Sequence, residues 1–478
     1  MSNTAAQTVA VAGASGFVGG HLAPVLHSDF ELVGLTREQT LAGSVDQQGY
    51  RWRLCDLFSR LDTHEALRGA DLAVYLVHSA RPSARLTQGS VADLDVLCAD
   101  NFARAAAAHD LDHIVHVTGL LNEDEPVSAP VEKAGELHST LASSGVPVTT
   151  LESSLIVGSG GATTETLVRL VERLPLMGCP AWTRVPVRPI DVRDVARLVG
   201  AVLGGEEQFA GSWQVGGPGE LSYLDMLRQT AEVFDYERRF FVFPVDSPRL
   251  SSLWVSTFGG VRYRVIRQLI DGLRQGPEIG VSDLQQRLGI EPAPFREAME
   301  AVRAERDSAR AEHEAGGAMV RKGEQLPAKR GTEHVRSVQR LPLPSGRSAR
   351  WVAREYARWL PDAVPLLLRV DVDAQNNCRF YLRPFPWPLL VLEFDSTVSR
   401  PDRQLFWIAG GMLAAEQERG RLEFREVLDG ESVLAAIHEF APAIPWLVYR
   451  FTQAIAHLWV MWRFSRHLAG MEACEDTG

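Results

Sequence analysis

The first half of the chain repeats a pattern in which a short apolar run is followed by a longer stretch of helical periodicity. One of the helical stretches, residues 101–109, is rich in alanine. The predicted strands cover residues 9–12, 30–35, 50–54, 71–77, 113–118, 146–151 and 213–217. Because parallel strands are joined by crossover helices, strands and helices that alternate at this spacing predict a doubly wound parallel sheet of the α/β class.

The pattern changes after residue 334, where strand-like runs follow one another with few helices between them. These runs cover residues 335–344, 366–372, 379–383, 389–396, 404–409, 421–428 and 432–440, the last of which also fits a helix. Helices are predicted over residues 348–360 and 445–468. In the second helix, Phe451, Ile455, Leu458 and Trp462 recur at i, i+4, i+7 and i+11, so we expect them to be buried against a curved antiparallel sheet.

The composition between these two patterns predicts a linker. Residues 306–333 are charged and rich in alanine, and Gly316, Gly317 and Gly331 interrupt them. A chain of 478 residues is also too long for one ordinary core. We therefore expect an α/β domain over residues 1–305, a partly helical linker over 306–333, and an α+β domain over 334–470.

Composition and charge exclude several classes of protein. The formal net charge of −11 argues against a nucleic-acid partner, which would require a basic face. The five cysteines lie far apart without metal-ligand spacing, so we expect reduced thiols in the cytoplasm and no metal site. The longest uncharged run near the C-terminus, residues 451–462, is too short for a transmembrane segment.

The segment GASGFVG, from Gly13 to Gly19, separates the first strand from the first helix. Gly13 lets the chain turn sharply, Gly16 leaves room for a pyrophosphate, and Gly19 lets the helix pack closely on the strand. The free N–H groups of the helix N-terminus then face the anion. This order of strand, glycine turn and helix predicts a dinucleotide site, whereas glycine spacing alone would also fit an ordinary turn.

Residues at the ends of the following strands extend this predicted site. Thr36 and Arg37 end the second strand, where an acid would bind the ribose of NAD and an arginine can pair with the 2′-phosphate of NADP. We therefore expect NADP, with NAD as the alternative, since Glu38 weakens the positive charge. Asp56 can reach the adenine amino group or cap the next helix. His78 and Ser79 end the fourth strand, at the same edge of the sheet.

GASGFVG, the strand end YLVHS, and the segments 99–120 and 147–177 resemble the atypical extended short-chain dehydrogenase/reductases, and within these an NmrA-like bacterial branch. The resemblance implies a Rossmann domain followed by a START-like helix-grip domain. It also implies NAD(P) binding, with further cofactor contacts from Ser15, Phe17, Val18, Leu57 and Ser154. Because most members of this branch have no assigned activity, the resemblance implies little about the reaction.

The chain departs from the active members of that family at the proton donor. Those enzymes carry a Tyr-x-x-x-Lys motif, in which the tyrosine donates a proton and the lysine lowers its pKa. Here Lys133 is present, but Ala129 occupies the position of the tyrosine, and no tyrosine occurs between Tyr75 and Tyr223. Thr118 and Lys133 are the remaining catalytic candidates, although Lys133 also fits an exposed helix residue.

These observations predict an NADP(H)-binding oxidoreductase that acts on a bulky apolar substrate. The alternative is a non-catalytic NAD(P)-responsive sensor, scaffold or lipid-binding protein. The partner we expect is an apolar small molecule or lipid bound by the second domain. An alternative role of this domain is peripheral contact with a membrane, through Trp459, Trp462, Arg463 and Arg466.

In the second domain, the acid–base candidates are His438, Glu439 and His457. We expect these histidines to have structural roles, because a lone histidine on an amphipathic element is usually a core or surface residue.

Overall fold

The computed structural model describes residues 6–77, 84–119, 130–153, 155–243, 283–314, 332–415 and 420–475. The chain forms two compact units, and each is built from two separate parts of the sequence. The first unit comprises Met1–His78 and Asn101–Glu324, and the second comprises Ser79–Asp100 and Gln325–Gly478. Residues 306–314 of the predicted linker belong to helix α12 (Phe295–Glu314). Residues 315–331 lie outside the described part of the chain.

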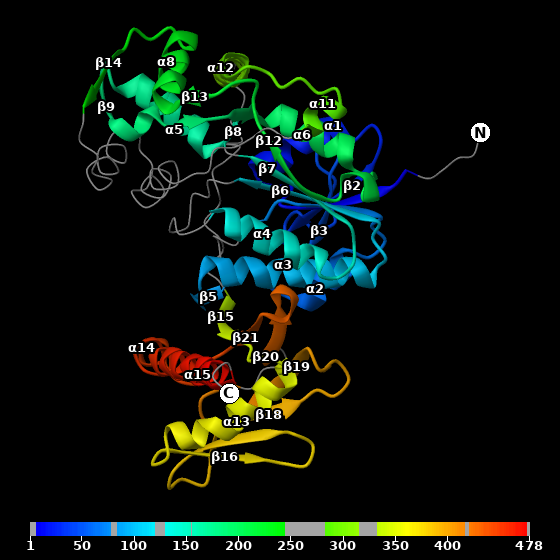
Figure 1. Cartoon of the computed structure of the whole chain (residues 1–478), viewed down its shortest axis with the longest axis vertical. Coiled ribbons are helices and arrows are strands. Elements are labelled where there is room, and N and C mark those ends of the chain that lie inside the picture. Colours follow the sequence, from blue (N-terminus) through cyan, green and yellow to red (C-terminus); the bar gives the residue numbers. More distant parts are fainter. Residues whose placement is uncertain are drawn as a thin grey trace. The chain divides into compact units, whose positions relative to one another are not determined.

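The first unit is organised around a seven-stranded parallel sheet (Figure 1). Its strands are β1 (Thr8–Ala12), β2 (Glu31–Thr36), β3 (Arg51–Leu54), β4 (Leu72–Tyr75), β6 (His113–Gly119), β7 (Val148–Ser153) and β12 (Gly211–Val215). Their order in the sheet is β12-β7-β6-β4-β1-β2-β3, and every adjacent pair is parallel. The predicted doubly wound Rossmann sheet is therefore confirmed.

Side chains that alternate along the strands pack against helices on both faces of this sheet. Val74, Val115 and Leu151 belong to a core that includes residues of α1 (Phe17–Leu26) and α6 (Val192–Val202). On the other face, Tyr75 contacts Phe102 of α3 (Val91–Ala108). Burial on both faces explains why β4 and residues 9–12 of β1, in the middle of the sheet, are apolar throughout instead of alternating with polar residues.

Shorter elements complete the first unit. Among the residues that the structure describes, the remaining helices of this unit are α2 (Arg60–Ala66), α4 (Pro130–Ala142), α5 (Ala162–Arg173), α7 (Glu206–Phe209), α8 (Tyr223–Val233) and α11 (Leu284–Arg287), with a 3-10 turn at Ala181–Arg184. Three strand pairs lie outside the main sheet: β8 (Leu155–Val157) with β11 (Pro189–Asp191), β9 (Leu176–Pro180) with β14 (Arg239–Phe243), and β10 (Pro186–Val187) with β13 (Leu221–Ser222). A second apolar core joins α5, α8 and α12.

The second unit contains an eight-stranded sheet in the order β16-β17-β18-β19-β20-β21-β15-β5. Its strands are β5 (Ala84–Gln88), β15 (Thr332–Pro342), β16 (Leu368–Val372), β17 (Cys378–Leu382), β18 (Pro388–Phe394), β19 (Arg403–Gly410), β20 (Arg421–Val427) and β21 (Ser432–Phe440). All neighbours are antiparallel except β5, which pairs in parallel with β15. The segment 432–440 is thus a strand, and β5 is an additional strand that the sequence pattern did not predict.

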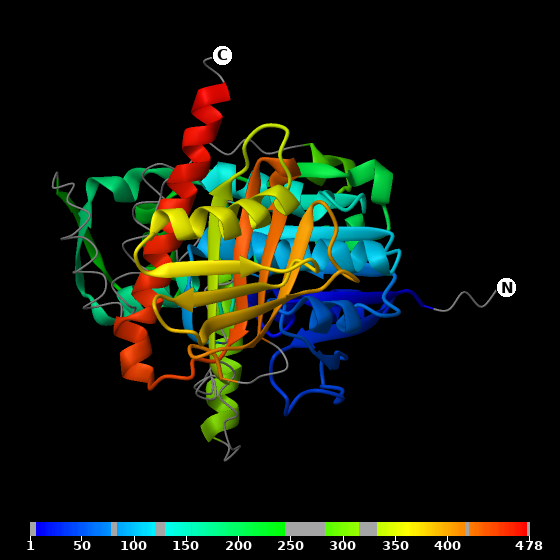
Figure 2. The same cartoon turned by 90° about the horizontal axis from the view of Figure 1, so that it is seen from below.

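One face of this sheet is apolar and packs against α13 (Ala349–Ala363) and α15 (Gln453–Glu475). Figure 2 shows these two helices lying across the sheet. Phe464 of α15 is fully buried, and its ring contacts those of Tyr356 and Trp359 at centroid distances of 5.1 Å. Burying a side chain of this size contributes about 1.5–3 kcal/mol. The α+β class of the second domain is therefore confirmed, and the START-like assignment stays a prediction.

The predicted buried stripe of the C-terminal helix is wrong. Phe451, Ile455 and Trp462 are 65%, 56% and 55% exposed, and Leu458 is 38% exposed. The helix also breaks near Thr452, between α14 (Trp446–Phe451) and α15. The buried face of α15 instead consists of Ala454, Met461, Phe464 and Leu468. Since apolar residues occupy both faces, periodicity alone selected the wrong one.

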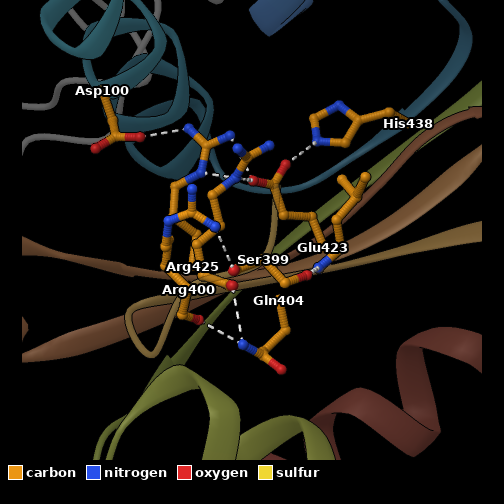
Figure 3. A network of polar contacts seen from close by, with 9 residues as sticks. Asp100, Ser399, Arg400, Gln404, Glu423, Arg425 and His438 are labelled. Atoms are coloured by element: carbon orange, nitrogen blue, oxygen red, sulfur yellow. Dashed lines mark hydrogen bonds and ion pairs between the residues drawn. The ribbon is translucent and has the colours of Figure 1, made fainter. Parts of the chain in front are cut away.

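On the opposite face, β19, β20 and β21 carry a network of charged residues, which Figure 3 shows, and these residues are also buried. Arg425 donates from Nη2 to Glu423 Oε1 at 2.7 Å and from Nη1 to Asp100 of α3. Glu423 also accepts from Arg403. Nearby, Asp93 of α3 accepts from Arg340 of β15 at 2.7 Å. Residues 91–100 of α3 are therefore held to this sheet by ion pairs.

The histidine candidates of the second unit have structural surroundings. His438 lies 3.6 Å from Glu423, and burial together with Arg421 lowers the pKa of His438 to about 3. Glu439 instead pairs with Arg421 at 3.4 Å. His457 contacts Ser337 Oγ at 3.1 Å, and burial lowers its pKa to about 4. Both histidines are thus neutral near pH 7, and the three candidates have different partners.

Candidate functional site

The turn between β1 and α1 is shaped by its glycines. Gly13 has a φ of +91°, a conformation that side chains other than glycine rarely adopt. The backbone N–H of Gly16 donates to the carbonyl of Gly13 at 2.9 Å, which closes the turn. Gly16 is the N-cap of α1, and within the described part of the chain no side chain caps that helix end. The first N–H groups of α1 are therefore available to an anion.

Gly19 brings α1 close to the turn that precedes it. A Cβ atom at this position would lie 2.4 Å from the carbonyl oxygen of Gly13 and 2.6 Å from Cα of Ala14. Both atoms belong to the backbone, so neither can move aside cheaply. For the neighbouring Gly20, no described atom outside the adjacent part of its own helix lies within 4 Å of the corresponding position. Only the first of these two glycines is required by packing.

The ring of Phe17 packs against a second glycine-rich segment, which follows β8. A Cβ at Gly161 would lie 2.9 Å from Cζ of Phe17, and one at Gly158 would lie 3.5 Å from its Cε2. The ring also contacts His21 edge-on at 5.6 Å. The side chain of Phe17 thus has a packing role, while its backbone N–H remains at the open end of α1.

Residues at the ends of β2 and β3 lie at the edge of the sheet where the glycine turn begins. Thr36 is buried and accepts from the backbone N–H of Glu38 at 3.1 Å, whereas Arg37 is exposed. Asp56 accepts from the backbone of Phe58 at 3.2 Å, and Ser59, not Asp56, caps α2. The carbonyl of Leu57 accepts from Asn101 at 2.8 Å.

Thr118 and Glu152 lie near the carboxyl ends of β6 and β7, where they are partners in register. They share a sheet face with His116 and Thr150, which are also register partners and contact each other at 3.3 Å. His138 of α4 contacts Thr150 Oγ1 at 2.9 Å, so α4 covers this face. Burial raises the pKa of Glu152, although a hydrogen bond with Ser212 opposes the shift. The pair therefore combines a buried hydroxyl with a carboxyl that holds its proton more readily than usual.

Ser153 ends β7 and is fully buried. Its hydroxyl has no hydrogen-bond partner among the residues that the structure describes. A buried hydroxyl without a partner is costly, and a ligand that supplies one relieves the cost. Together with the close glycine turn and the uncapped α1, this orphan hydroxyl fits a bound dinucleotide at the carboxyl edge of the sheet.

Three predicted site residues, His78, Ser79 and Ser154, lie outside the described part of the chain. The same is true of Ala129, which stands where the family has its tyrosine. Lys133 lies in the first turn of α4. Of the remaining predicted residues, Ser15 is exposed and Val18 is half-buried, both in the glycine turn. Their contacts with a cofactor stay a prediction.

Glu152 and Ser153 were missed by sequence analysis. The strand there was predicted to end at residue 151, so both residues fell beyond it. A polar pair that follows an apolar parallel strand is a signal that could have found them, because ligands bind at such strand ends.

The first part of the chain matches a protein-family model described as NAD(P)H-binding, over residues 13–144. Over 119 residues the chain is also 30% identical to the Auxiliary protein GraX of Staphylococcus aureus strain NCTC 8325 / PS 47. That alignment covers 25% of this chain and 38% of GraX. The family match includes the glycine turn, Arg37, Asp56 and Thr118, and it identifies an NAD(P)H-binding domain.

Solved structures similar to this chain include a reductase, an epimerase and a quinone oxidoreductase. The Citrobacter sp. triphenylmethane reductase complexed with NADP(H) is 18% identical, with a TM-score of 0.48 over 62% of this chain and 99% of that one. A nucleoside-diphosphate-sugar epimerase from Staphylococcus aureus is 16% identical, with a TM-score of 0.48 over 62% and 100%. An NADPH-dependent quinone oxidoreductase from Escherichia coli is 17% identical, with a TM-score of 0.47 over 61% and 98%.

Proposed function

We propose that this protein is an NADP(H)-dependent oxidoreductase of the atypical extended short-chain type, with a bulky apolar substrate and a cytoplasmic setting. The observation that carries the proposal is the glycine turn from Gly13 to Gly19, which lies inside the NAD(P)H-binding match. Its close backbone approach and uncapped helix N-terminus suit a pyrophosphate. The NmrA-like branch and a START-like second unit are the finer assignments we propose with it.

The preference for NADP rests on Arg37. This residue is exposed directly after β2, at the position where NAD-selective sites place an acid. A guanidinium can form charge-assisted hydrogen bonds with a 2′-phosphate, and it gains little from a ribose hydroxyl.

The first expected result concerns this selectivity. Arg37→Ala should weaken NADPH binding by about 1.5–3 kcal/mol, or roughly ten- to a hundredfold, and leave NADH binding nearly unchanged. Isothermal titration with both nucleotides measures this. Arg68→Ala is the control, because Arg68 is an exposed arginine in an ordinary surface pair with Glu65. If the wild type bound both nucleotides with equal affinity, Arg37 would not select NADP over NAD. If it bound neither nucleotide, the proposed function would be contradicted.

The proposed reaction is reduction of a carbonyl or enone. NADPH supplies the hydride when it is bound. We assign the proton to Glu152, whose carboxyl group is protonated more readily than usual, with Thr118 as a hydrogen-bond donor to the substrate oxygen. Lys133, in the first turn of α4, is the proposed contact to the nicotinamide ribose.

The second expected result tests Glu152. Glu152→Gln should lower kcat about a hundredfold or more, because the amide cannot donate a proton in the reaction, while NADPH affinity stays unchanged. In the wild type, activity should fall as pH rises through the raised pKa of Glu152. The Glu152→Gln variant should not show this fall in activity with rising pH. Glu136→Gln, on α4, is the control carboxyl. Wild-type activity in Glu152→Gln would contradict the assignment.

A second candidate function is a non-catalytic protein that responds to NAD(P). Two observations favour it: Ala129 replaces the family's tyrosine, and the similar Staphylococcus aureus protein is named as an auxiliary protein. NADPH oxidation measured across ketones, enones and isoprenoid-like lipids separates the two. Tight cofactor binding without turnover of any substrate would favour the sensor.

A further inference from the structure

The solvent side of α14 and α15 is lined by large apolar side chains. Leu447 is 68% exposed, Phe451 is 65% exposed and Ile455 is 56% exposed. Trp459 and Trp462 continue this surface, at 46% and 55%. We call these five residues the apolar stripe.

The apolar stripe is not the face by which α15 joins the protein core. That role belongs to Ala454, Met461, Phe464 and Leu468, which are all at most 3% exposed. A helix that is apolar on both sides is normally buried on both sides. Contiguous exposed apolar residues of this kind mark a binding surface.

The charged residues that α14 and the first nineteen residues of α15 carry beside the apolar stripe are arginines. Residues 446–471 contain Arg450, Arg463 and Arg466 and no aspartate or glutamate, in a chain of net charge −11. Each arginine lies over an exposed ring: Arg450 over Phe451 at 5.7 Å, Arg463 over Trp459 at 5.2 Å and Arg466 over Trp462 at 5.1 Å. A locally basic surface on an acidic protein is complementary to an anionic partner.

We propose that the apolar stripe binds the surface of an anionic lipid bilayer. Tryptophan rings favour the boundary between headgroups and acyl chains, and the arginines that stack on them would contact the lipid phosphates. Phenylalanine, isoleucine and leucine would enter the apolar layer beneath. The helix would lie along the membrane surface, and no helix in the described part of the chain is apolar enough over a sufficient length to span a bilayer.

The test uses the full-length protein and large unilamellar vesicles that are sedimented with it. The wild type should bind vesicles of phosphatidylcholine with 30 mol% phosphatidylglycerol at least tenfold more tightly than pure phosphatidylcholine, at about 0.1 M salt. Raising the salt to about 1 M should reduce this preference, because the arginine contribution is screened. Binding to neither kind of vesicle would overturn the proposal.

Two variants and one control locate the surface. W459S/W462S should weaken binding to both vesicles, on the order of tenfold for each tryptophan. R463Q/R466Q should abolish most of the preference for phosphatidylglycerol. W387S is the matched control, since Trp387 is 61% exposed and lies outside α14 and α15. An equal loss in W387S would overturn the assignment. If the wild type does not bind lipid and instead forms a dimer that the W459S/W462S substitutions dissociate, a second copy of the chain covers the apolar stripe. That result would also overturn the proposal.

Discussion

Gly19→Ala should destabilise the protein by about 3 kcal/mol and abolish tight NADPH binding. The added Cβ would lie 2.4 Å from the carbonyl oxygen of Gly13, in the turn that we propose holds the pyrophosphate. Relief requires α1 to move away from that turn, which would displace the open N–H groups of the helix. Urea unfolding measures the loss of stability, and isothermal titration measures the loss of affinity.

Gly20→Ala provides the matched control, one residue further along the same helix. Beyond the adjacent helix backbone, no described atom lies within 4 Å of its Cβ position, so alanine there should be neutral or should stabilise the helix by up to about 1 kcal/mol. NADPH affinity should stay at the wild-type value. If the two alanine variants behave alike, the close approach at Gly19 is not what shapes the site.

Arg425→Met should cost about 3–5 kcal/mol of the free energy of unfolding, the second large effect we expect. Arg425 is 1% exposed and neutralises two buried carboxylates, Glu423 and Asp100. Although burial alone raises the pKa of Glu423, Arg425 and Arg403 outweigh it and hold that pKa well below its usual value. Removing the guanidinium would therefore leave buried negative charges without their main partner.

The size of this loss is measured by urea unfolding at pH 7. Arg68→Met is the control, because Arg68 and Glu65 are both about two-thirds exposed and such a pair contributes 1 kcal/mol or less. Arg425→Lys keeps a positive charge without the fork-shaped guanidinium, so its cost should fall between those of the other two variants. A loss below about 1 kcal/mol in Arg425→Met would contradict the expectation.

The parallel sheet was predictable from the sequence because its strands are buried on both faces. Val9, Ala10, Val11 and Ala12 are all fully buried, so the strand appears in the sequence as an unbroken apolar run. The glycine turn follows it directly, and the spacing of Gly13, Gly16 and Gly19 is a local property of the chain. Local patterns of this kind can be recognised in the sequence without knowing which distant residues pack against them.

Features that depend on distant partners were not predictable in this way. β5 has the sequence ARLTQ, which is short and contains one large apolar residue, Leu86, and its partner β15 lies far along the sequence. Arg425 and Glu423 alternate with apolar residues as in a half-exposed strand, yet α3 contributes Asp100 to their buried network. The exposed side of α15 was mistaken for the buried side because both sides are apolar.

The pairing of β5 with β15 has a consequence for the order of folding. The ribosome completes β5 long before it completes β15, so until the second unit is synthesised β5 is an unpaired edge strand and Asp93 and Asp100 lack their arginines. A fragment that begins after the linker would lack β5 and the first half of α3, and would expose the edge of β15 to aggregation. The two units are therefore poor candidates for separate expression, and contacts of high sequence separation should make the second unit the slower one to fold.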